Sequence, residues 1–408
     1  MGMRTAIAIV VALGLAAGCA EHDPPPVEPI EPISLVEELD PQTAEWLARA
    51  TNDFGFDLLA ELGDGGNVVV SPVSISSVLT MLLNGAVGET GRSIASTLHV
   101  DDRREDEVNS AYASLLALLE GSGDVDLTVA NSLWPDDGIE MRSDYVDSVG
   151  DSFGAEIDQV DLGDADTAER IDGWVRRETR GLIDGISEEL GLPDPRAVLV
   201  LLNAVYFKSA WTEPFDPDVT RDGKFARSDG STVSVPMMSR DDDILYGRGD
   251  GFQVVRLPYG DDERFAMEIF LPDGRLDEFR FDAARWADAV AAVSKQRILL
   301  ALPRLELEYA TQEGALDEAL KALGMGLVYS PDSDFGRLSR SDPWLSTIVH
   351  KTYIRVDEEG TEAAAVTGGA AAVSAPPEFR VDRPFLFTIS DTETGAIVFL
   401  GTVTDPTA

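Results

Sequence analysis

The sequence predicts a fold of the α+β class within one large domain. Two observations lead to this prediction: segments with helical periodicity come first in the chain, and strand-like apolar runs dominate its second half. From about residue 40 onward we find no second linker and no internal repeat. Because helices and strands are segregated and do not alternate, the pattern favours α+β over a doubly wound sheet.

The predicted helices share apolar positions three and four residues apart, which places one face of each helix on a core. A helix needs such a face because packing, more than intrinsic propensity, stabilises it in a globular protein. The helical segments are residues 42–62, 74–85, 90–97, 105–120, 142–152, 166–178 and 313–322.

The predicted strands are short apolar runs, and they include a hairpin at the C-terminal end. In the hairpin, residues 385–390 and 396–401 flank a turn at Thr394–Gly395, and the second strand is apolar enough to be fully buried. The other strand-like runs are residues 68–70, 198–206, 265–271, 298–302 and 348–356.

Composition limits the possible partners. The chain has 408 residues, of which 44% are hydrophobic, so it can bury a large core. Its formal net charge of −42 argues against nucleic acid as a partner, because phosphate binding needs clustered Lys and Arg, which Asp and Glu dilute here. The acidity itself indicates solubility or a saline medium, and we draw no function from it.

The N-terminal residues predict export. Arg4 precedes an apolar run over residues 6–15, which is too short for a membrane-spanning helix and typical of a secretory signal. The following Leu15–Cys19 segment resembles a bacterial lipoprotein signal, although Ala16 stands where that pattern prefers Leu. We therefore expect a signal peptide over residues 1–18 and a lipid anchor on Cys19. The alternative is a plain secretory signal with a coincidental cysteine.

A tether is predicted after the signal. Residues 19–41 comprise the lipidated N-terminus and a Pro- and Glu-rich stretch, which favours an extended, stiff chain over a fold of its own. The folded domain is then residues 42–408. We expect the protein to be exported and either lipid-anchored to a bacterial cell envelope, at the outer membrane or the surface, or extracellular.

Motifs of catalysis and metal binding are missing from the sequence. Histidine occurs only as His22, His99 and His350, without a Gly-x-Ser-x-Gly elbow or a His-Glu-x-x-His motif. Cys19 is the only cysteine, so the folded domain has no thiol nucleophile and no cysteine ligand for zinc. A Ser/His hydrolase is thus a remote alternative. We predict that the protein is not an enzyme and needs no cofactor or metal.

Residues 358–375 are the most informative stretch. After Glu362 the segment has no charge, no aromatic residue and no Leu, Ile or Met, so it cannot build a core of its own. Alternate residues of a strand share a face, and one such set here is entirely small, which would let the segment enter between two existing strands. The small residues are Thr361, Ala363, Ala365, Thr367, Gly369 and Ala371, with Glu362 on the opposite face.

From about residue 42 to the end, the chain resembles the serpins, a family of serine protease inhibitors. The loop segment is preceded by His350–Lys351 and Val356–Gly360, and followed by Pro376–Phe379 and Arg383–Phe385, as in a serpin reactive-centre loop. Several independent motifs in the right order make the resemblance specific. These are Ser71–Ile75 with Leu83–Ala86, Asn203–Lys208 with Trp211 and Pro214–Phe215, Val235–Met238, Leu257–Tyr259, Phe270–Pro272, Leu302–Leu305 and Asp334–Phe335.

The resemblance implies a serpin fold, with three β-sheets surrounded by helices and an exposed reactive-centre loop. It also implies a suicide-type inhibitor of serine proteases, or of papain-like cysteine proteases. The protease cleaves the loop, and the loop then inserts into the main sheet while the acyl-enzyme is still attached. Serpin loop insertion is itself a standard example of strand addition and of released strain. The alternative is a non-inhibitory serpin-fold binding protein at the cell surface.

The resemblance also assigns roles to particular residues. A buried polar cluster that controls sheet opening corresponds to Ser71, Ser74, Asn203 and His350, and the top of the sheet to Trp211, Arg304 and Glu358. The hinge corresponds to Glu358, Glu359, Gly360, Thr361, Glu362, Ala363, Ala364 and Ala365.

The reactive bond has two possible positions. It is Val373–Ser374 when counted back from the proline pair and Ser374–Ala375 when counted forward from Glu358, and we favour the first. Small apolar residues at this bond predict an elastase-like or subtilisin-like target for a monomeric inhibitor. Gly368–Gly369 departs from the expected pattern and weakens the strand that would insert.

Overall fold

The computed structural model describes residues 41–63, 66–121, 125–312, 314–341, 343–361 and 376–407, all of which belong to one compact unit, Val36–Ala408. The predicted signal peptide and tether up to residue 40, with Cys19, lie outside these ranges, as do loop residues 362–375. Within the described ranges, no helix is both long enough and apolar enough to cross a membrane.

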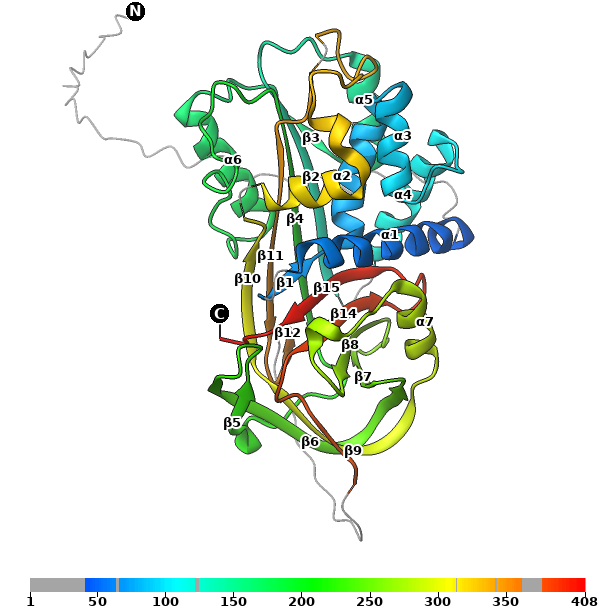
Figure 1. Ribbon diagram of the computed structural model, residues 1–408, viewed down its shortest axis with the longest axis vertical. Coiled ribbons are helices and arrows are strands. Elements are labelled where there is room, and N and C mark those ends of the chain that lie inside the picture. The colour runs from blue at the N-terminus through cyan, green and yellow to red at the C-terminus, as the bar shows by residue number, and fades with distance from the viewer. Residues whose placement is uncertain are drawn as a thin grey trace, which may run out of the picture. The chain divides into compact units, whose positions relative to one another are not determined.

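The predicted helices of the first half are confirmed, with shifts of one or two residues at their ends (Figure 1). The buried α2 lies at the centre of this group; it follows the extended Ser71 and has Pro72 in its first turn, where the missing N–H costs nothing. The helices are α1 (Pro41–Leu62), α2 (Pro72–Gly85), α3 (Gly88–Thr97), α4 (Glu105–Glu120), α5 (Ser143–Phe153) and α6 (Ala165–Glu178).

The second half contains two further α-helices in the described ranges. One is α7 (Ala283–Ala291), which the periodicity did not reveal, and the other is α8 (Ala315–Leu320). The predicted helix 313–322 was too long, because the α-helix gives way to a wider turn at Lys321–Met325, where Gly324 has a φ of 114°.

A six-stranded sheet runs in the order β10-β11-β4-β2-β3, with the short β12 (Gly360–Thr361) paired to β4. Its central strands β4 and β11 are parallel and pair only from Val200–Thr347 to Val205–Thr352, although both strands continue beyond that point. We call this pairing the seam. The strands are β2 (Asp126–Pro135), β3 (Glu156–Ile157), β4 (Leu199–Ala210), β10 (Leu305–Ala310) and β11 (Thr347–Val356).

A nine-stranded sheet forms the other half of the molecule, in the order β1-β15-β14-β8-β7-β6-β9-β13, with β5 paired to β6. The family resemblance implied three sheets, but β6 and β9 run unbroken and hydrogen bonding joins two of them into one. The strands are β1 (Val68–Val70), β5 (Arg221–Ala226), β6 (Thr232–Gly249), β7 (Phe252–Tyr259), β8 (Phe265–Pro272), β9 (Ser294–Pro303), β13 (Glu378–Arg380), β14 (Phe385–Asp391) and β15 (Ile397–Val403).

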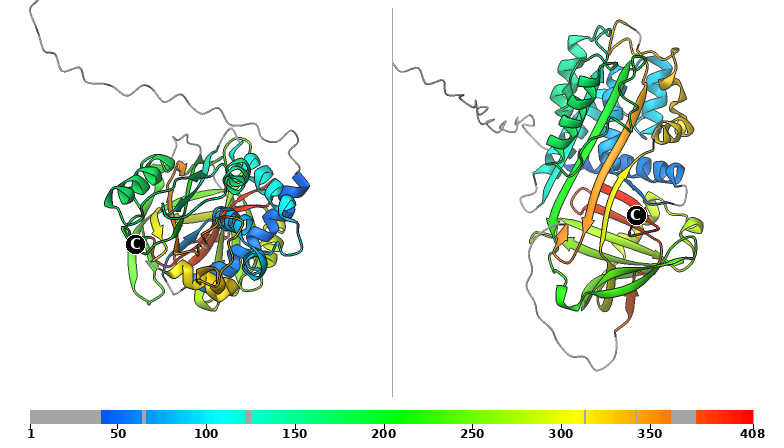
Figure 2. Two further views of the ribbon diagram at one scale, coloured as in Figure 1. Left: turned by 90° about the horizontal axis from the view of Figure 1, so that it is seen from above. Right: turned by 90° about the vertical axis from the view of Figure 1, so that its left-hand side faces the viewer.

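Both faces of the six-stranded sheet are covered. On one face, β4 packs against the buried α2 within the main apolar core. On the other face lie α6 and the segment that follows it (Figure 2). Their apolar side chains form a second cluster with Val200, Leu202 and Val349. Because side chains alternate along a strand, His350 faces the α2 side while Val349 and Lys351 face the α6 side.

Candidate functional site

The hinge residues form the start of a strand. After β11 the chain turns back through Asp357–Glu359, and β12 (Gly360–Thr361) pairs antiparallel with the far end of β4. Gly360 is opposite Ala210, and Thr361 is opposite Ser209. This pairing lies beyond the seam, where β4 and β11 are no longer bonded to one another. The first two residues of the loop therefore already occupy the sheet.

Gly360 is required at this position. Its φ is +135°, a conformation that residues with a side chain rarely adopt. A Cβ would also lie 2.5 Å from the carbonyl oxygen of Ser209 and 2.5 Å from the backbone nitrogen of Trp211. Both constraints come from the close approach of the returning chain to β4.

Backbone hydrogen bonds fix the turn before Gly360. The Asp357 N–H donates to the Gly360 carbonyl at 3.0 Å, and the Trp211 N–H donates to the Glu359 carbonyl at 3.0 Å. The Trp211 indole Nε1–H donates to the Asp357 carbonyl at 2.9 Å. The indole ring itself stacks on Tyr259, with ring centroids 4.4 Å apart. Trp211 thus connects the turn to the neighbouring nine-stranded sheet.

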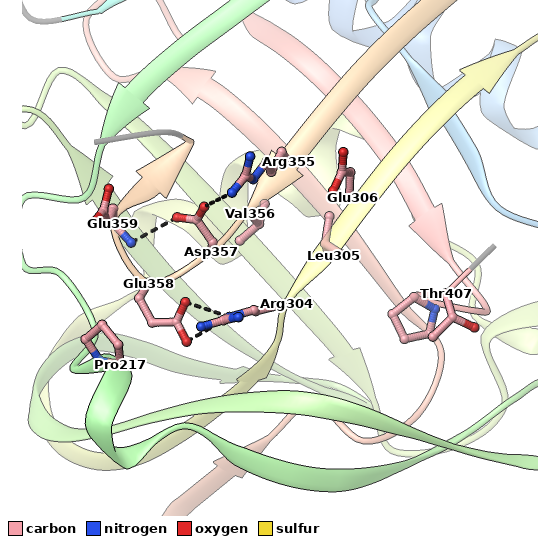
Figure 3. Close-up of a pocket in the computed structure, with 11 residues that line it drawn as sticks. Pro217, Arg304, Leu305, Glu306, Arg355, Val356, Asp357, Glu358, Glu359 and Thr407 are labelled. Carbon is pink, nitrogen blue, oxygen red and sulfur yellow. Dashed lines mark hydrogen bonds and ion pairs between the residues drawn. The ribbon is translucent and has the colours of Figure 1, made fainter. Parts of the chain in front are cut away.

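The Glu358 side chain fixes the turn through an ion pair with Arg304, as Figure 3 shows. Arg304 Nε lies 2.8 and 2.6 Å from the two oxygens of the Glu358 carboxylate, and the Thr220 hydroxyl donates to the same group. The Glu358 side chain is only 4% exposed. Burial acts to raise the pKa of Glu358, but the hydrogen bonds from Arg304 and Thr220 outweigh it and hold the pKa below its usual range.

A cavity of about 600 Å³ opens beside this ion pair. The ends of β10 and β11 supply Leu305 and Val356, the turn supplies Asp357, and the C-terminal segment supplies Thr407 (Figure 3). The cavity therefore borders the turn and the ion pair that holds it.

The predicted buried polar cluster centres on His350, at the seam between β4 and β11. The Ser71 N–H donates to His350 Nε2 at 3.0 Å, so this ring nitrogen is unprotonated. His350 Nδ1 then carries the proton and donates to Asn203 Oδ1, 3.2 Å away. Complete burial lowers the pKa of His350 to about 3, so the ring is neutral at physiological pH.

Asn203 extends the cluster to a residue that the sequence did not reveal. Its amide Nδ2 donates to Asn131 Oδ1 at 2.7 Å, and the Ser77 hydroxyl donates to the same oxygen at 3.1 Å. Asn131 lies on β2, which pairs with β4. Because β2 also contains Asp126, Thr128 and Ser132, nothing in the local sequence marked Asn131 as a member of the cluster. The cluster therefore links α2 with three neighbouring strands.

Ser71 and Ser74 join the cluster differently from the prediction. Their main chains take part, because Ser71 contributes its N–H and the Ser74 carbonyl accepts from Asn203 Nδ2 at 3.3 Å and from Ser77 at 2.8 Å. Within the described part of the chain, their buried hydroxyls have no hydrogen-bond partner. The two serines therefore hold the cluster through their main-chain atoms and not through their hydroxyls.

Several predicted site residues cannot be placed. Hinge residues Glu362–Ala365, the reactive-bond residues Val373–Ala375 and the lipidation residue Cys19 all lie outside the described residues. Among the residues that are described, no group of three or more His, Cys, Asp or Glu side chains is arranged to hold a metal ion.

Comparison with known protein families identifies the chain over nearly the whole of its folded part. The model of the serpin family, serine protease inhibitors, matches residues 49–406. The chain belongs to the serpin family. Serpins are generally protease inhibitors rather than enzymes, and they interact with target proteases; the family also has members that do not inhibit.

Known serpins resemble the chain over nearly its whole folded length. Serpin-Z10 of Arabidopsis thaliana is 32% identical over 86% of this chain and 94% of its own length. Leukocyte elastase inhibitor of Bos taurus is 32% identical over 89% of this chain and 100% of its own. The solved structure of human thyroxine-binding globulin with thyroxine has a TM-score of 0.82 at 26% identity, covering 90% of this chain and 100% of the other.

Proposed function

We propose that this serpin is a suicide-type inhibitor of serine proteases, and of papain-like cysteine proteases with a similar preference. The protease attacks the Val373–Ser374 bond and forms an acyl-enzyme, and the cleaved loop then inserts between β4 and β11. Insertion carries the attached protease away from the site of cleavage and distorts it before the acyl bond can be hydrolysed.

The single observation that best supports this proposal is the pairing of β12 with β4. Gly360 and Thr361 already run antiparallel to β4, in the direction that an inserted loop must follow, and the residues after them are small. Insertion would extend this pairing toward the seam. It would replace one parallel pairing with two antiparallel pairings, and antiparallel pairing is slightly more stable per residue.

The decisive experiment looks for a covalent complex. The purified protein is incubated with an elastase-like or a subtilisin-like protease, denatured and separated by size. A denaturation-resistant band at the summed mass of inhibitor and protease is the expected result. Cleavage of the loop with no such band, for every protease that cuts it, would overturn the inhibitory proposal.

Loop insertion has a second signature, which needs no trapped protease. If the cleaved loop adds a strand to the sheet, the loop-cleaved protein must unfold at a higher temperature than the intact protein. An unchanged or lower midpoint after cleavage at residues 372–375 contradicts insertion.

A non-inhibitory binding function is the alternative, because the fold also occurs in thyroxine-binding globulin, which was solved with thyroxine. The hinge sequence Thr361–Ala365 argues against it, since its residues other than Glu362 are small. The bovine relative, named as an inhibitor of leukocyte elastase, supports the inhibitory function.

We also propose that the inhibitor is exported by a bacterium and held at its membrane by lipid on Cys19, with residues 20–34 as a tether. The support is the sequence before Cys19 alone. Membrane fractionation tests it: the wild-type protein is expected in the membrane fraction and Cys19→Ser in the soluble fraction. Wild-type protein found in the soluble fraction contradicts the anchor.

A further inference from the structure

A second cavity, of about 270 Å³, lies among the helices of the first half of the chain. The end of α2, the beginnings of α4 and α5, and residues 336–337 line it, so it shares no residue with the hinge or with the His350 cluster. Apart from Gly336, each described residue that lines it carries a polar or charged group. Since one water molecule takes about 30 Å³ of liquid volume, the cavity has room for a molecule of about nine non-hydrogen atoms.

An arginine without a partner lines this cavity. Arg142 directly precedes α5, and its Nε is buried without a hydrogen-bond partner in the part of the chain that the structure describes. Its guanidinium forms no ion pair with any described residue, although Asp and Glu outnumber Lys and Arg by 74 to 32 in the chain. A buried donor without an acceptor is costly, and a carboxylate matches the planar fork of N–H groups on arginine. Arg142 therefore favours a carboxylate in the cavity.

The other charged groups of the cavity determine what else the ligand must carry. Arg337 and Glu105 are bonded to each other through both terminal nitrogens of the guanidinium, so their charges cancel. Asp144 is exposed, lines the same cavity and has no hydrogen bond or ion pair with a described residue. One unpaired charge of each sign therefore remains, on Arg142 and on Asp144.

The walls of the cavity are fixed by contacts that need no ligand. Asn84 and Asn109 exchange two amide hydrogen bonds, at 2.9 and 2.7 Å, and so join α2 to α4. The Tyr145 hydroxyl donates to the Met81 carbonyl at 3.1 Å and joins α5 to α2. A ligand would thus enter a site that is already formed, which reduces the ordering cost of binding.

We propose that this cavity binds a free α-amino acid with a small polar side chain. Its carboxylate accepts hydrogen bonds from Arg142, its ammonium pairs with Asp144, and the Ser148 hydroxyl lies in the same wall for a polar side chain. A simple anion would face Asp144 and the net charge of −42, whereas an amino acid adds no net charge. The site is independent of the proposed inhibitory function.

Calorimetric titration of the full-length protein with three related compounds tests the proposal. Serine carries both charges, N-acetylserine lacks the ammonium and serinamide lacks the carboxylate. We expect serine to bind, and each blocked compound to bind at least about tenfold more weakly, because each loses one charged contact. Serine should also raise the thermal midpoint of unfolding, since it binds the folded state.

Two variants separate the roles of the charges. Arg142→Gln should weaken the binding of serine at least about tenfold. Asp144→Asn should bind serine and N-acetylserine with equal affinity, because it removes the partner of the ammonium. Asp144 is exposed, so this variant provides the test if Arg142→Gln does not fold.

Arg340→Gln is the matched control. It removes an arginine that pairs with Glu140 at 2.6 Å on the surface and does not line the cavity, so it should bind serine as the wild type does. Absence of serine binding, equal binding of a blocked compound by the wild type, or an equal loss in the control overturns the proposal. Tighter binding of N-acetylserine than of serine would indicate a simple anion site and would also overturn it.

Discussion

His350 and Asn203 are register partners across the seam between β11 and β4, and His350 Nδ1 lies 3.2 Å from Asn203 Oδ1. Their hydrogen bond joins the two strands that loop insertion would separate on the proposed mechanism. Because the bond is buried, neither group can exchange it for one to water while the sheet is closed. The closed sheet therefore depends on a neutral histidine that carries its proton on Nδ1.

Acid should weaken the closed sheet through His350. Its pKa is lowered to about 3 in the folded protein from an ordinary value of 6.5, so the folded state binds fewer protons than the unfolded state between these values. The stabilising contribution is complete above pH 6.5 and is lost as the pH falls toward 3, by at most about 1.4 kcal/mol per pH unit.

The measurement compares thermal midpoints of wild type and His350→Gln over this pH range. The difference between the two midpoints should shrink as the pH falls from 6.5. Carboxylates also titrate in this range, but they do so in both proteins and cancel in the difference. A difference that is constant with pH would contradict the assigned protonation state.

Loss of Arg304 should loosen the hinge. Arg304→Gln leaves the buried Glu358 carboxylate without its cation, and because the Arg304 side chain is 44% exposed we expect a cost of about 1 kcal/mol at neutral pH. The pKa of Glu358 is lowered in the fold, so this contribution is present above its ordinary value of 4.5 and is lost below it.

Chemical unfolding at pH 7 and at pH 3 checks this prediction. The destabilisation should be clear at pH 7 and smaller at pH 3. Arg297→Gln is the control, because it breaks a surface pair with Asp241 far from the hinge. Equal losses at both pH values would argue against the ion pair as the cause.

Thr361→Arg should convert the inhibitor into a substrate. Thr361 pairs with Ser209 at the entry to the sheet, and an arginine there would need to leave water without a partner for its charge. Insertion would then be slower than hydrolysis of the acyl-enzyme. The stoichiometry of inhibition should rise severalfold, whereas Thr361→Ser should leave it near the wild-type value. Unchanged trapping by the arginine variant would show that the assigned register is wrong.

Val373→Arg should move inhibition toward trypsin-like proteases at the expense of elastase-like ones. A protease binds the residue before the scissile bond in a pocket whose depth and charge set its preference, and residues 370–375 are only Ala, Val and Ser. The measurement compares the association rates of wild type and variant with a trypsin-like and an elastase-like protease. The variant should react faster with the first and more slowly with the second. Efficient trapping of trypsin by the unmodified protein would refute the predicted specificity.

Sequence periodicity predicted the early helices well and the long strands poorly. Residues 105–120 were predicted within their observed bounds, because a single apolar face and an acidic first turn mark them. Residues 232–249 were missed as a strand because Asp241, Asp242 and Asp243 interrupt the alternation. These residues lie where β6 pairs with β9, and backbone pairing with that neighbour compensates for their low strand propensity.

The residues of the candidate site were also predicted only in part. The family resemblance drew attention to Asn203, His350, Arg304 and Glu358, and the structure places each pair in contact. Asn131 was missed because its role comes from the strand next to Asn203, and strand order does not appear in local sequence. The use of main-chain atoms at Ser71 and Ser74 was likewise invisible, since side-chain identity does not reveal which backbone groups remain unpaired.

The parallel pairing at the seam has a consequence for the order of events in folding. Parallel strands form from distant parts of the chain, and β4 must wait for β11, which is synthesised well over a hundred residues later. The loop follows β11 directly in the sequence. On the proposed mechanism, pairing of the loop with β4 and β11 is more stable than the pairing of these two strands with each other. The active form is then obtained because β4 pairs with β11 faster than the loop inserts between them, although the state with the loop inserted has the lower free energy. Refolding from denaturant at high temperature should accordingly return part of the protein as an uncleaved, inactive monomer.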